Sequence, residues 1–180
     1  MPRDEQGIRV SADRYRIIPR TLCFVCDGDD VLLLKGAPNK RLWANRYNGV
    51  GGHVERGEDV CSAALREICE ETGWQAGDIA DMQLRGLIHI DAGDPQTGIM
   101  LFLFTATALR RDTAASEEGT LEWISRQKLM EYDLVEDLTV LLPRVLALTT
   151  DDPTLFGRYS YGPDDKLLIS ISDCHLPGML

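Results

Sequence analysis

Three glutamates with helical spacing are the side chains of this 180-residue sequence that are best suited to chemistry. Glu67 precedes Glu70 by three positions and Glu71 by four, so a helix would place all three carboxylates on one face. Like charges this close repel one another, and a cation should offset the repulsion. Arg66 offers one positive charge, but a hard divalent cation fits better because Mg²⁺ prefers oxygen ligands. A solvent-exposed acidic face is the alternative.

The segment before these glutamates favours a ligand site over a solvent-exposed face. Gly51, Gly52 and Gly57 allow backbone carbonyls and amides to approach a ligand closely. His53 lies in the same segment and is a candidate for contacting a phosphate. Because the glycines lead directly into the acidic run, we expect both features to belong to one site.

The hydrophobic pattern predicts the elements that must position these residues. Residues 58–72 have helical periodicity and are followed by Gly73, which suits a left-handed C-cap. A short helix is expected at 126–131, and a longer one at 137–148, which Pro143 should kink or mark as an early turn. Apolar runs predict strands at residues 21–26, 31–35, 84–90, 99–109 and 122–124, and a closing hairpin at residues 156–161 and 167–171.

The order of these elements predicts one α+β domain over residues 17–180, preceded by a loose lead-in at residues 1–16. A polar loop is expected at residues 36–46, with Trp43 as its anchor or as part of a cleft rim. Cys23 and Cys26 lie three apart on a predicted strand, so they should point to opposite faces and share no metal.

Composition narrows the classes of partner. The formal net charge is -10, which does not favour the phosphate backbone of a nucleic acid polymer. A small polyanionic substrate remains compatible if metal ions bridge it to acidic groups. No apolar run approaches the length of a membrane span, and the polar start lacks the apolar core of a signal peptide. We therefore expect a cytoplasmic protein without a membrane partner.

The acidic run and the glycines before it resemble the Nudix box, a 23-residue motif of the Nudix hydrolase family. Every specified position of the box is filled, by Gly52, Glu58, Arg66, Glu67, Ile68, Glu70, Glu71, Gly73 and Trp74. The resemblance implies the Nudix fold, in which a mixed β-sheet is sandwiched between α-helices. It also implies Mg²⁺, with Mn²⁺ as a substitute, and hydrolysis of a phosphoanhydride bond in a nucleoside diphosphate derivative.

Roles of single residues follow from the resemblance. It implies that Glu67, Glu70 and Glu71 bind metal and that the carbonyl of Gly51 is a further ligand. Arg66, paired with Glu58, would orient these groups, while Gly52 and Gly73 shape the backbone. The catalytic set is thus Glu67, Arg66 and Glu70, with Glu67 as the candidate general base. Family members often add a carboxylate from a later loop, for which Glu117 and Glu118 are both candidates.

The substrate must be set by residues outside the box. Residues 47–52 resemble the approach to the box in purine nucleoside triphosphatases that remove oxidised nucleotides such as 8-oxo-dGTP. There an asparagine bonds the base, so Asn48 inherits that role unless it only turns the backbone. Glu136 and Asp137 match acids that read a purine edge, but no tryptophan accompanies them. Broad nucleoside triphosphate hydrolysis to a monophosphate and pyrophosphate is therefore the expectation.

Two other functions remain open at this point. An ADP-ribose or nucleotide-sugar pyrophosphatase would use the same box, and such proteins often dimerise. A non-catalytic, nucleotide-sensing Nudix domain is the alternative from another class, although such domains usually lack some of the box carboxylates. The sequence permits a monomer or a homodimer.

Overall fold

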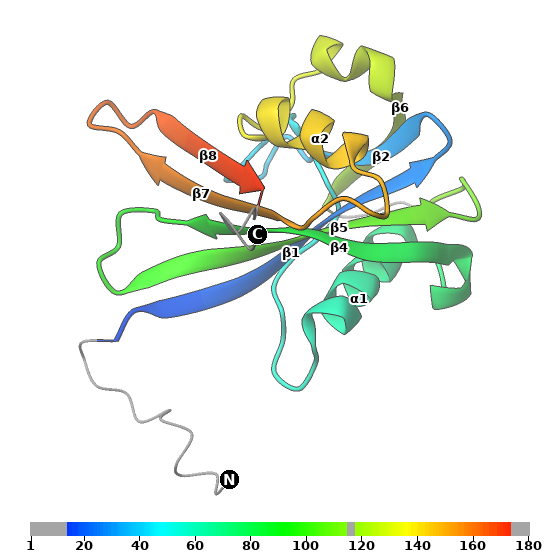
Figure 1. Ribbon diagram of the computed structural model, residues 1–180. Helices are drawn as coiled ribbons and strands as arrows, with labels where there is room; N and C mark the ends of the chain where they lie inside the picture. Colours follow the sequence, from blue (N-terminus) through cyan, green and yellow to red (C-terminus); the bar gives the residue numbers. More distant parts are fainter. Residues whose placement is uncertain (1–13, 115–117, 174–180) are drawn as a thin grey trace, which may run out of the picture.

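The computed structural model describes residues 14–114 and 118–173, in which a mixed β-sheet carries one α-helix on each face (Figure 1). The sheet has eight strands in the order β3-β2-β1-β5-β4-β7-β8, and β6 pairs with β2. This is the α+β arrangement, with helices on both sides of the sheet, that the sequence predicted. In chain order the elements are β1 (Arg16–Asp27), β2 (Asp30–Gly36), β3 (Tyr47–Asn48), α1 (Val60–Thr72), η2 (Ala76–Asp78), β4 (Ile79–Ile90), β5 (Thr97–Ala108), β6 (Gly119–Ser125), η3 (Arg126–Glu131), α2 (Leu138–Ala147), β7 (Leu155–Tyr161) and β8 (Leu167–Asp173).

Strand β1 pairs with its two neighbours over different lengths. It runs parallel to β5 from the pair Arg16–Thr97 to the pair Cys26–Thr107. Its antiparallel pairing with β2 covers only the three pairs next to the hairpin turn. The rest of that edge of β1 is therefore open to another segment of the chain.

Two hydrophobic cores lie on the two faces of the sheet, because side chains alternate along each strand. On β1, Leu22 and Phe24 belong to the core covered by α2. Cys23 and Val25 belong to the core covered by α1. Cys26 packs against the first of these cores, so the prediction that the two cysteines point to opposite faces is confirmed.

Helix α1 has a defined boundary at each end. The Asp59 carboxylate accepts the backbone N–H groups of Cys61 at 2.8 Å and Ser62 at 3.0 Å, which satisfies two donors that the helix leaves unpaired. At the other end Gly73 adopts a left-handed φ of 75° and donates its N–H to the Cys69 carbonyl at 2.9 Å. The predicted C-cap is confirmed, and the acidic residues lie on a helix with a defined cap at each end.

The other predicted elements are mostly confirmed, with differences at their ends. Strands β1 and β4 begin several residues earlier than the apolar runs that predicted them, because their pairing with β5 continues past those runs. Arg16, assigned to the loose lead-in, already belongs to β1, while residues 1–13 lie outside the described residues. Pro143 lies inside α2 on an exposed position and does not mark an early turn. No helix in the described ranges is long and apolar enough to cross a membrane.

Candidate active site

The glycine segment fills the open edge of β1 and thereby builds one wall of the site. Backbone hydrogen bonds join Cys23 to Val50 in both directions, at 2.7 and 3.1 Å. The Thr21 N–H then donates to the Gly52 carbonyl at 2.8 Å. A further antiparallel bridge joins Arg20 to His53. These bonds fix the segment between the sheet and α1.

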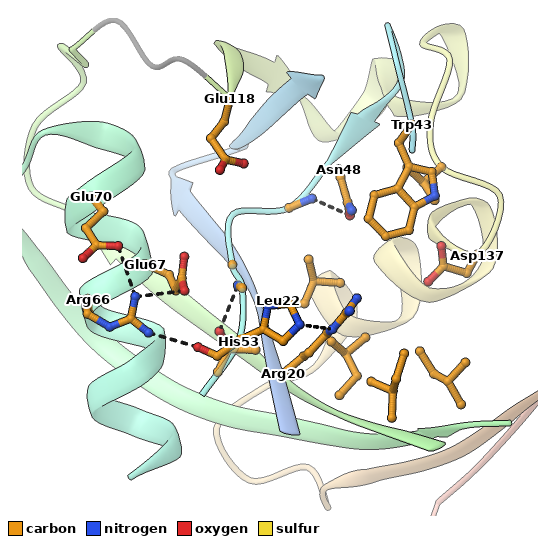
Figure 2. A pocket seen from close by; sticks show the side chains of 18 of the residues that line it. Arg20, Leu22, Trp43, Asn48, His53, Arg66, Glu67, Glu70, Glu118 and Asp137 are labelled. Carbon is orange, nitrogen blue, oxygen red and sulfur yellow. Dashed lines mark hydrogen bonds and ion pairs between the residues drawn. The ribbon is translucent and has the colours of Figure 1, made fainter. Parts of the chain in front are cut away.

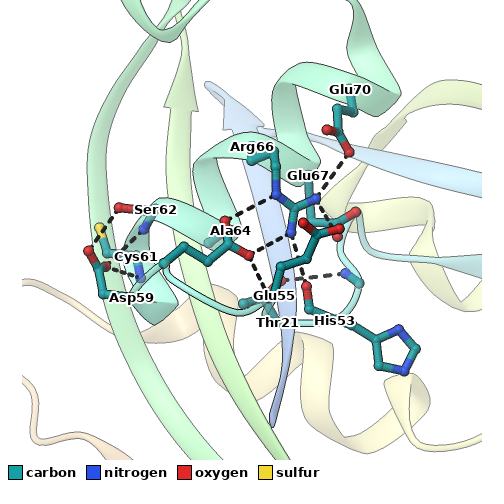
Figure 3. A network of polar contacts seen from close by, with 12 residues as sticks. Thr21, His53, Glu55, Asp59, Cys61, Ser62, Ala64, Arg66, Glu67 and Glu70 are labelled. Carbon is teal, nitrogen blue, oxygen red and sulfur yellow. Dashed lines mark hydrogen bonds and ion pairs between the residues drawn. The ribbon is translucent and has the colours of Figure 1, made fainter.

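Arg66 links the glycine segment to the acidic helix (Figure 3). Its guanidinium donates two hydrogen bonds to the Glu58 carboxylate, at 2.8 and 3.1 Å, and one to the His53 carbonyl at 3.0 Å. The Nη1 atom also donates to Glu67 at 2.9 Å and to Glu70 at 3.1 Å. These contacts raise the pKa of Arg66, chiefly through Glu58, so the guanidinium stays charged. The structure shows the expected pairing of Arg66 with Glu58 and the contacts by which Arg66 holds two of the box carboxylates.

Glu71 is the buried member of the acidic group, with a relative exposure of 6%. Its Oε1 accepts the backbone N–H of Gly51 at 3.2 Å, but its Oε2 is buried with no hydrogen-bond partner among the described residues. Burial raises the pKa of Glu71 to about 8, and the nearby carboxylates of Glu118 and Glu67 raise it further. A buried carboxylate oxygen without a partner is costly, so this position fits a bound cation.

Gly52 allows the close approach of the backbone to Glu67. A Cβ atom at position 52 would lie 2.6 Å from Cδ of Glu67, closer than two carbons can approach. Partial burial raises the pKa of Glu67, while Arg66 opposes that shift. The structure therefore gives a steric reason for glycine at position 52, because a residue with a side chain would displace Glu67.

The sequence left Glu117 and Glu118 as candidates for an additional metal-binding carboxylate, and the structure describes only Glu118. Glu118 lies at the rim, where its Oε2 forms a 2.6 Å ion pair with Lys40. It is close enough to raise the pKa of both Glu67 and Glu71. Glu117 lies outside the described residues. Glu118 thus remains a candidate ligand that the fold brings next to the box.

A cavity of about 540 Å³ extends from the acidic residues across the sheet (Figure 2). Glu67, Glu70 and Glu118 lie at one end of the cavity. Apolar side chains from β1, β4, β5 and the segment before α2 line another part of the cavity, namely Leu22, Ile90, Ile99, Leu101 and Val135. One end is therefore suited to phosphate and cations, and the other to a flat apolar group.

Two of the predicted substrate-binding residues line the apolar end. Asn48 uses its Oδ1 to accept the Gly49 N–H at 2.8 Å, which is the backbone-turning role, yet its side chain also lines the cavity. Its amide NH₂ can still donate to a ligand. Asp137 also lines the cavity, and burial raises the pKa of its carboxyl group. Glu136 is exposed and does not line the cavity, so the fold does not bring it together with Asp137.

Sequence reasoning missed Arg20 as a lining residue, and of its two expectations for Trp43, loop anchor or cleft rim, the structure supports the cleft rim. Arg20 lines the middle of the cavity and its Nε donates to Nε2 of His53 at 3.1 Å, which places two nitrogen-rich side chains beside the acidic end. Trp43 does not anchor its loop in the core, because it is 46% exposed and lines the cavity. An arginine on a strand belongs to no motif, so only its bridge to His53 reveals Arg20 as a lining residue.

The three box carboxylates do not form a closed cage. Within residues 14–114 and 118–173, no three His, Cys, Asp or Glu side chains lie close enough together to hold a metal ion. Arg66 holds Glu67 and Glu70, while Glu71 points to Gly51. The metal-ligand roles of these residues remain predictions, which the unpaired oxygen of Glu71 supports.

The fold and the box together define the class of protein. A family model described as the NUDIX domain matches residues 17–145, so the chain belongs to the Nudix family and is a MutT-like Nudix hydrolase. Enzymes of this family generally use a divalent metal. Among solved structures, the mutator MutT protein of Bacillus halodurans is similar, with a TM-score of 0.70 and 29% identity over 87% of this chain and 98% of that chain.

Curated relatives match this chain at a similar sequence identity. The mouse oxidized purine nucleoside triphosphate hydrolase is 29% identical over 149 residues, which cover 82% of this chain and 89% of the mouse protein. The nucleoside triphosphatase NudI of Salmonella typhimurium is 31% identical over 110 residues, which cover 57% of this chain and 78% of that protein.

Proposed function

We propose that this Nudix hydrolase cleaves nucleoside triphosphates between the α and β phosphates, releasing a nucleoside monophosphate and pyrophosphate. The observation that carries the proposal is the continuous cavity, which joins the box carboxylates to an apolar end lined by Asn48 and Asp137. A triphosphate chain at the acidic end and a base at the apolar end use both halves. The substrates named for the mouse and Salmonella relatives support the same class.

We further propose Mg²⁺ as the metal, with Mn²⁺ as a substitute. Glu67, Glu70, Glu71 and the Gly51 carbonyl would hold it, joined by Glu118, and all of these donors are oxygen atoms, as Mg²⁺ prefers. When bound, such an ion neutralises phosphate charge and lowers the pKa of water. The buried, unpaired Oε2 of Glu71 is the feature of this chain that fits it.

The reaction itself requires one water and one base. Water adds to the α-phosphorus. The bond from that phosphorus to the oxygen bridging the α and β phosphates breaks, and pyrophosphate leaves with the bonding electrons. Glu67 accepts the proton of the water, and in the metal-free protein partial burial raises the pKa of this carboxyl group. Arg66 keeps the Glu67 carboxylate oriented through its 2.9 Å contact. His53 and Arg20 lie beside the phosphate end and are suited to bind phosphate oxygens.

The experiment is a substrate panel with separate detection of pyrophosphate and monophosphate. The panel contains 8-oxo-dGTP, the four ordinary dNTPs and ADP-ribose, each with and without Mg²⁺. We expect magnesium-dependent pyrophosphate release from one or more triphosphates, reduced by orders of magnitude in Glu67→Gln. Near-normal turnover in that variant would exclude Glu67 as the base. Preferential cleavage of ADP-ribose would replace the proposed substrate, and no turnover on any nucleotide would favour a ligand-sensing domain.

A further inference from the structure

Trp43 occupies an unusual position for a large aromatic residue. It lies in the loop between β2 and β3 with a left-handed φ of 58°, a conformation that costs free energy for a residue other than glycine. The loop is closed by backbone bonds, since the Arg46 N–H donates to the Trp43 carbonyl and the Gly36 N–H donates to the Arg46 carbonyl, both at 3.0 Å. Backbone hydrogen bonds therefore fix the loop at Trp43, and its indole is exposed.

The indole lies at the apolar end of the cavity. Figure 2 shows it on the side of Asn48 and Asp137, away from Glu67 and Glu70. The other two tryptophans of the sequence pack in or against the hydrophobic core, whereas Trp43 does not. Trp74 and Trp123 stack on each other with ring centroids 6.4 Å apart, and each indole N–H donates to a backbone carbonyl. Trp43 has no comparable contact among the described residues, so its exposed face is available to a ligand.

We propose that Trp43 stacks on the base of the bound nucleotide and favours a purine over a pyrimidine. The inference rests on the proposed function, because it assumes that a nucleotide occupies the cavity. Stacking on an aromatic face is strong for any base and grows with the overlapping ring area, which is larger for two fused rings. The segment before α2 offers Val135 and Asp137 to the cavity but no aromatic ring, so the β2–β3 loop supplies the flat surface instead.

Asn48 and Asp137 give this stacking surface a polar edge. The amide NH₂ of Asn48 can donate to a ring nitrogen or carbonyl. The Asp137 carboxyl, whose pKa burial raises, can present either a donor or an acceptor to the base edge. Trp43 thus orients the plane of the base by stacking, and Asn48 and Asp137 form hydrogen bonds with the edge of the base.

Tryptophan fluorescence tests the stacking without turnover. The protein is titrated with dGMP, a nucleoside monophosphate, in the absence of divalent metal, and fluorescence is compared with calorimetric affinity. We expect saturable quenching in the native protein and in Trp123→Phe, the matched control. Trp43→Phe should lose the quenching but keep its affinity for dGMP within a few-fold. Trp43→Ala should bind about ten- to a hundredfold more weakly.

A second titration with thymidine monophosphate tests the base preference. The native protein should bind dGMP more tightly, and the difference should shrink in Trp43→Ala. Circular dichroism and melting curves show whether each variant is folded. Absence of quenching in the native protein, quenching that persists in Trp43→Phe, or unchanged dGMP affinity in Trp43→Ala would each overturn the stacking.

The two proposals fail in distinguishable ways. Pyrophosphate release without quenching leaves the function standing and removes the stacking. Quenching that depends on Trp43 without any nucleotide hydrolysis leaves the stacking standing and removes the proposed function.

Discussion

The backbone N–H of Gly51 donates to Oε1 of Glu71 at 3.2 Å, while the other oxygen of that carboxylate is buried without a partner in the described residues. One bond to a neutral donor compensates little for removing a negative charge from water. The glycine segment thus meets the helix at a carboxylate that the protein alone does not satisfy.

Glu71→Gln should make the metal-free protein more stable at alkaline pH. Burial raises the pKa of Glu71 from 4.5 to about 8, so its contribution to stability is present below pH 4.5 and is lost as the pH rises through 8. The variant should match the native protein near pH 4 and exceed it at pH 8.5 by more than about 1 kcal/mol in free energy of unfolding. Urea unfolding in the presence of a chelator measures this difference.

Added Mg²⁺ should reverse the order of stability. A ligand that binds only the folded protein raises its stability, and the gain should be larger at pH 8.5 than at pH 6 because the cation must otherwise displace a proton. Glu71→Gln should lose most of this gain. An equal stabilisation of both proteins by Mg²⁺ would show that Glu71 is not a ligand.

Gly52→Ala should reduce activity far more than stability. The added methyl group overlaps the Glu67 carboxylate, which can move away at low cost because it ends a flexible side chain. A displacement of about 1 Å in a catalytic group costs about a hundredfold in rate. The measurement pairs kcat for pyrophosphate release with the melting temperature. Gly77→Ala is the matched control, since its Cβ would meet nothing within 4 Å, and a similar loss of kcat there would contradict the steric explanation.

Asp137→Asn should stabilise the fold in a pH-dependent way. Burial raises the pKa of Asp137 above its ordinary 3.8, so the native protein loses stability as the pH rises from that value through the higher folded pKa. The variant avoids this loss and should show no advantage below pH 3.8 and a growing one above it. The ratio of turnover rates on different nucleotides should change at the same time, because substitutions that stabilise a functional site commonly alter its activity. Glu136→Gln, at an exposed position, serves as the control and should alter neither property.

Arg66→Lys should weaken both the fold and the reaction. A lysine has one charged nitrogen and cannot reproduce the fork that joins Glu58, the His53 carbonyl and Glu67. Loss of these charge-assisted bonds should cost about 1–3 kcal/mol in free energy of unfolding and lower kcat about ten- to a hundredfold. Arg144→Lys on the exposed side of α2 controls for the change of residue type. Native stability and native kcat in Arg66→Lys would show that the charge alone suffices.

The sequence predicted those parts of the site that depend on local spacing. Periodicity and a terminal glycine predicted α1. The pairing of Glu58 with Arg66 was also predicted, because both residues belong to one continuous segment of the chain. The burial of Glu71 was not predictable, because it depends on where the glycine segment inserts beside β1. Arg20 was missed as a cavity residue for the same reason, whereas the expectation that Trp43 belongs to the cleft rim agrees with the structure. Arg20 lies in the site through its long-range bridge to His53, which no local pattern encodes.

The parallel pairing of β1 with β5 also dictates when the cleft can form. Each residue of β1 meets a partner about 80 positions further along the chain, and closing so long a loop must precede the contacts that reward it. A nascent chain that ends before Thr97 already contains the whole run from Gly52 to Trp74. It still lacks the cleft, because Ile99 and Leu101 on β5 form part of the cavity wall. The motif is therefore synthesised first, and the active site forms only after β5 has been synthesised and has paired with β1.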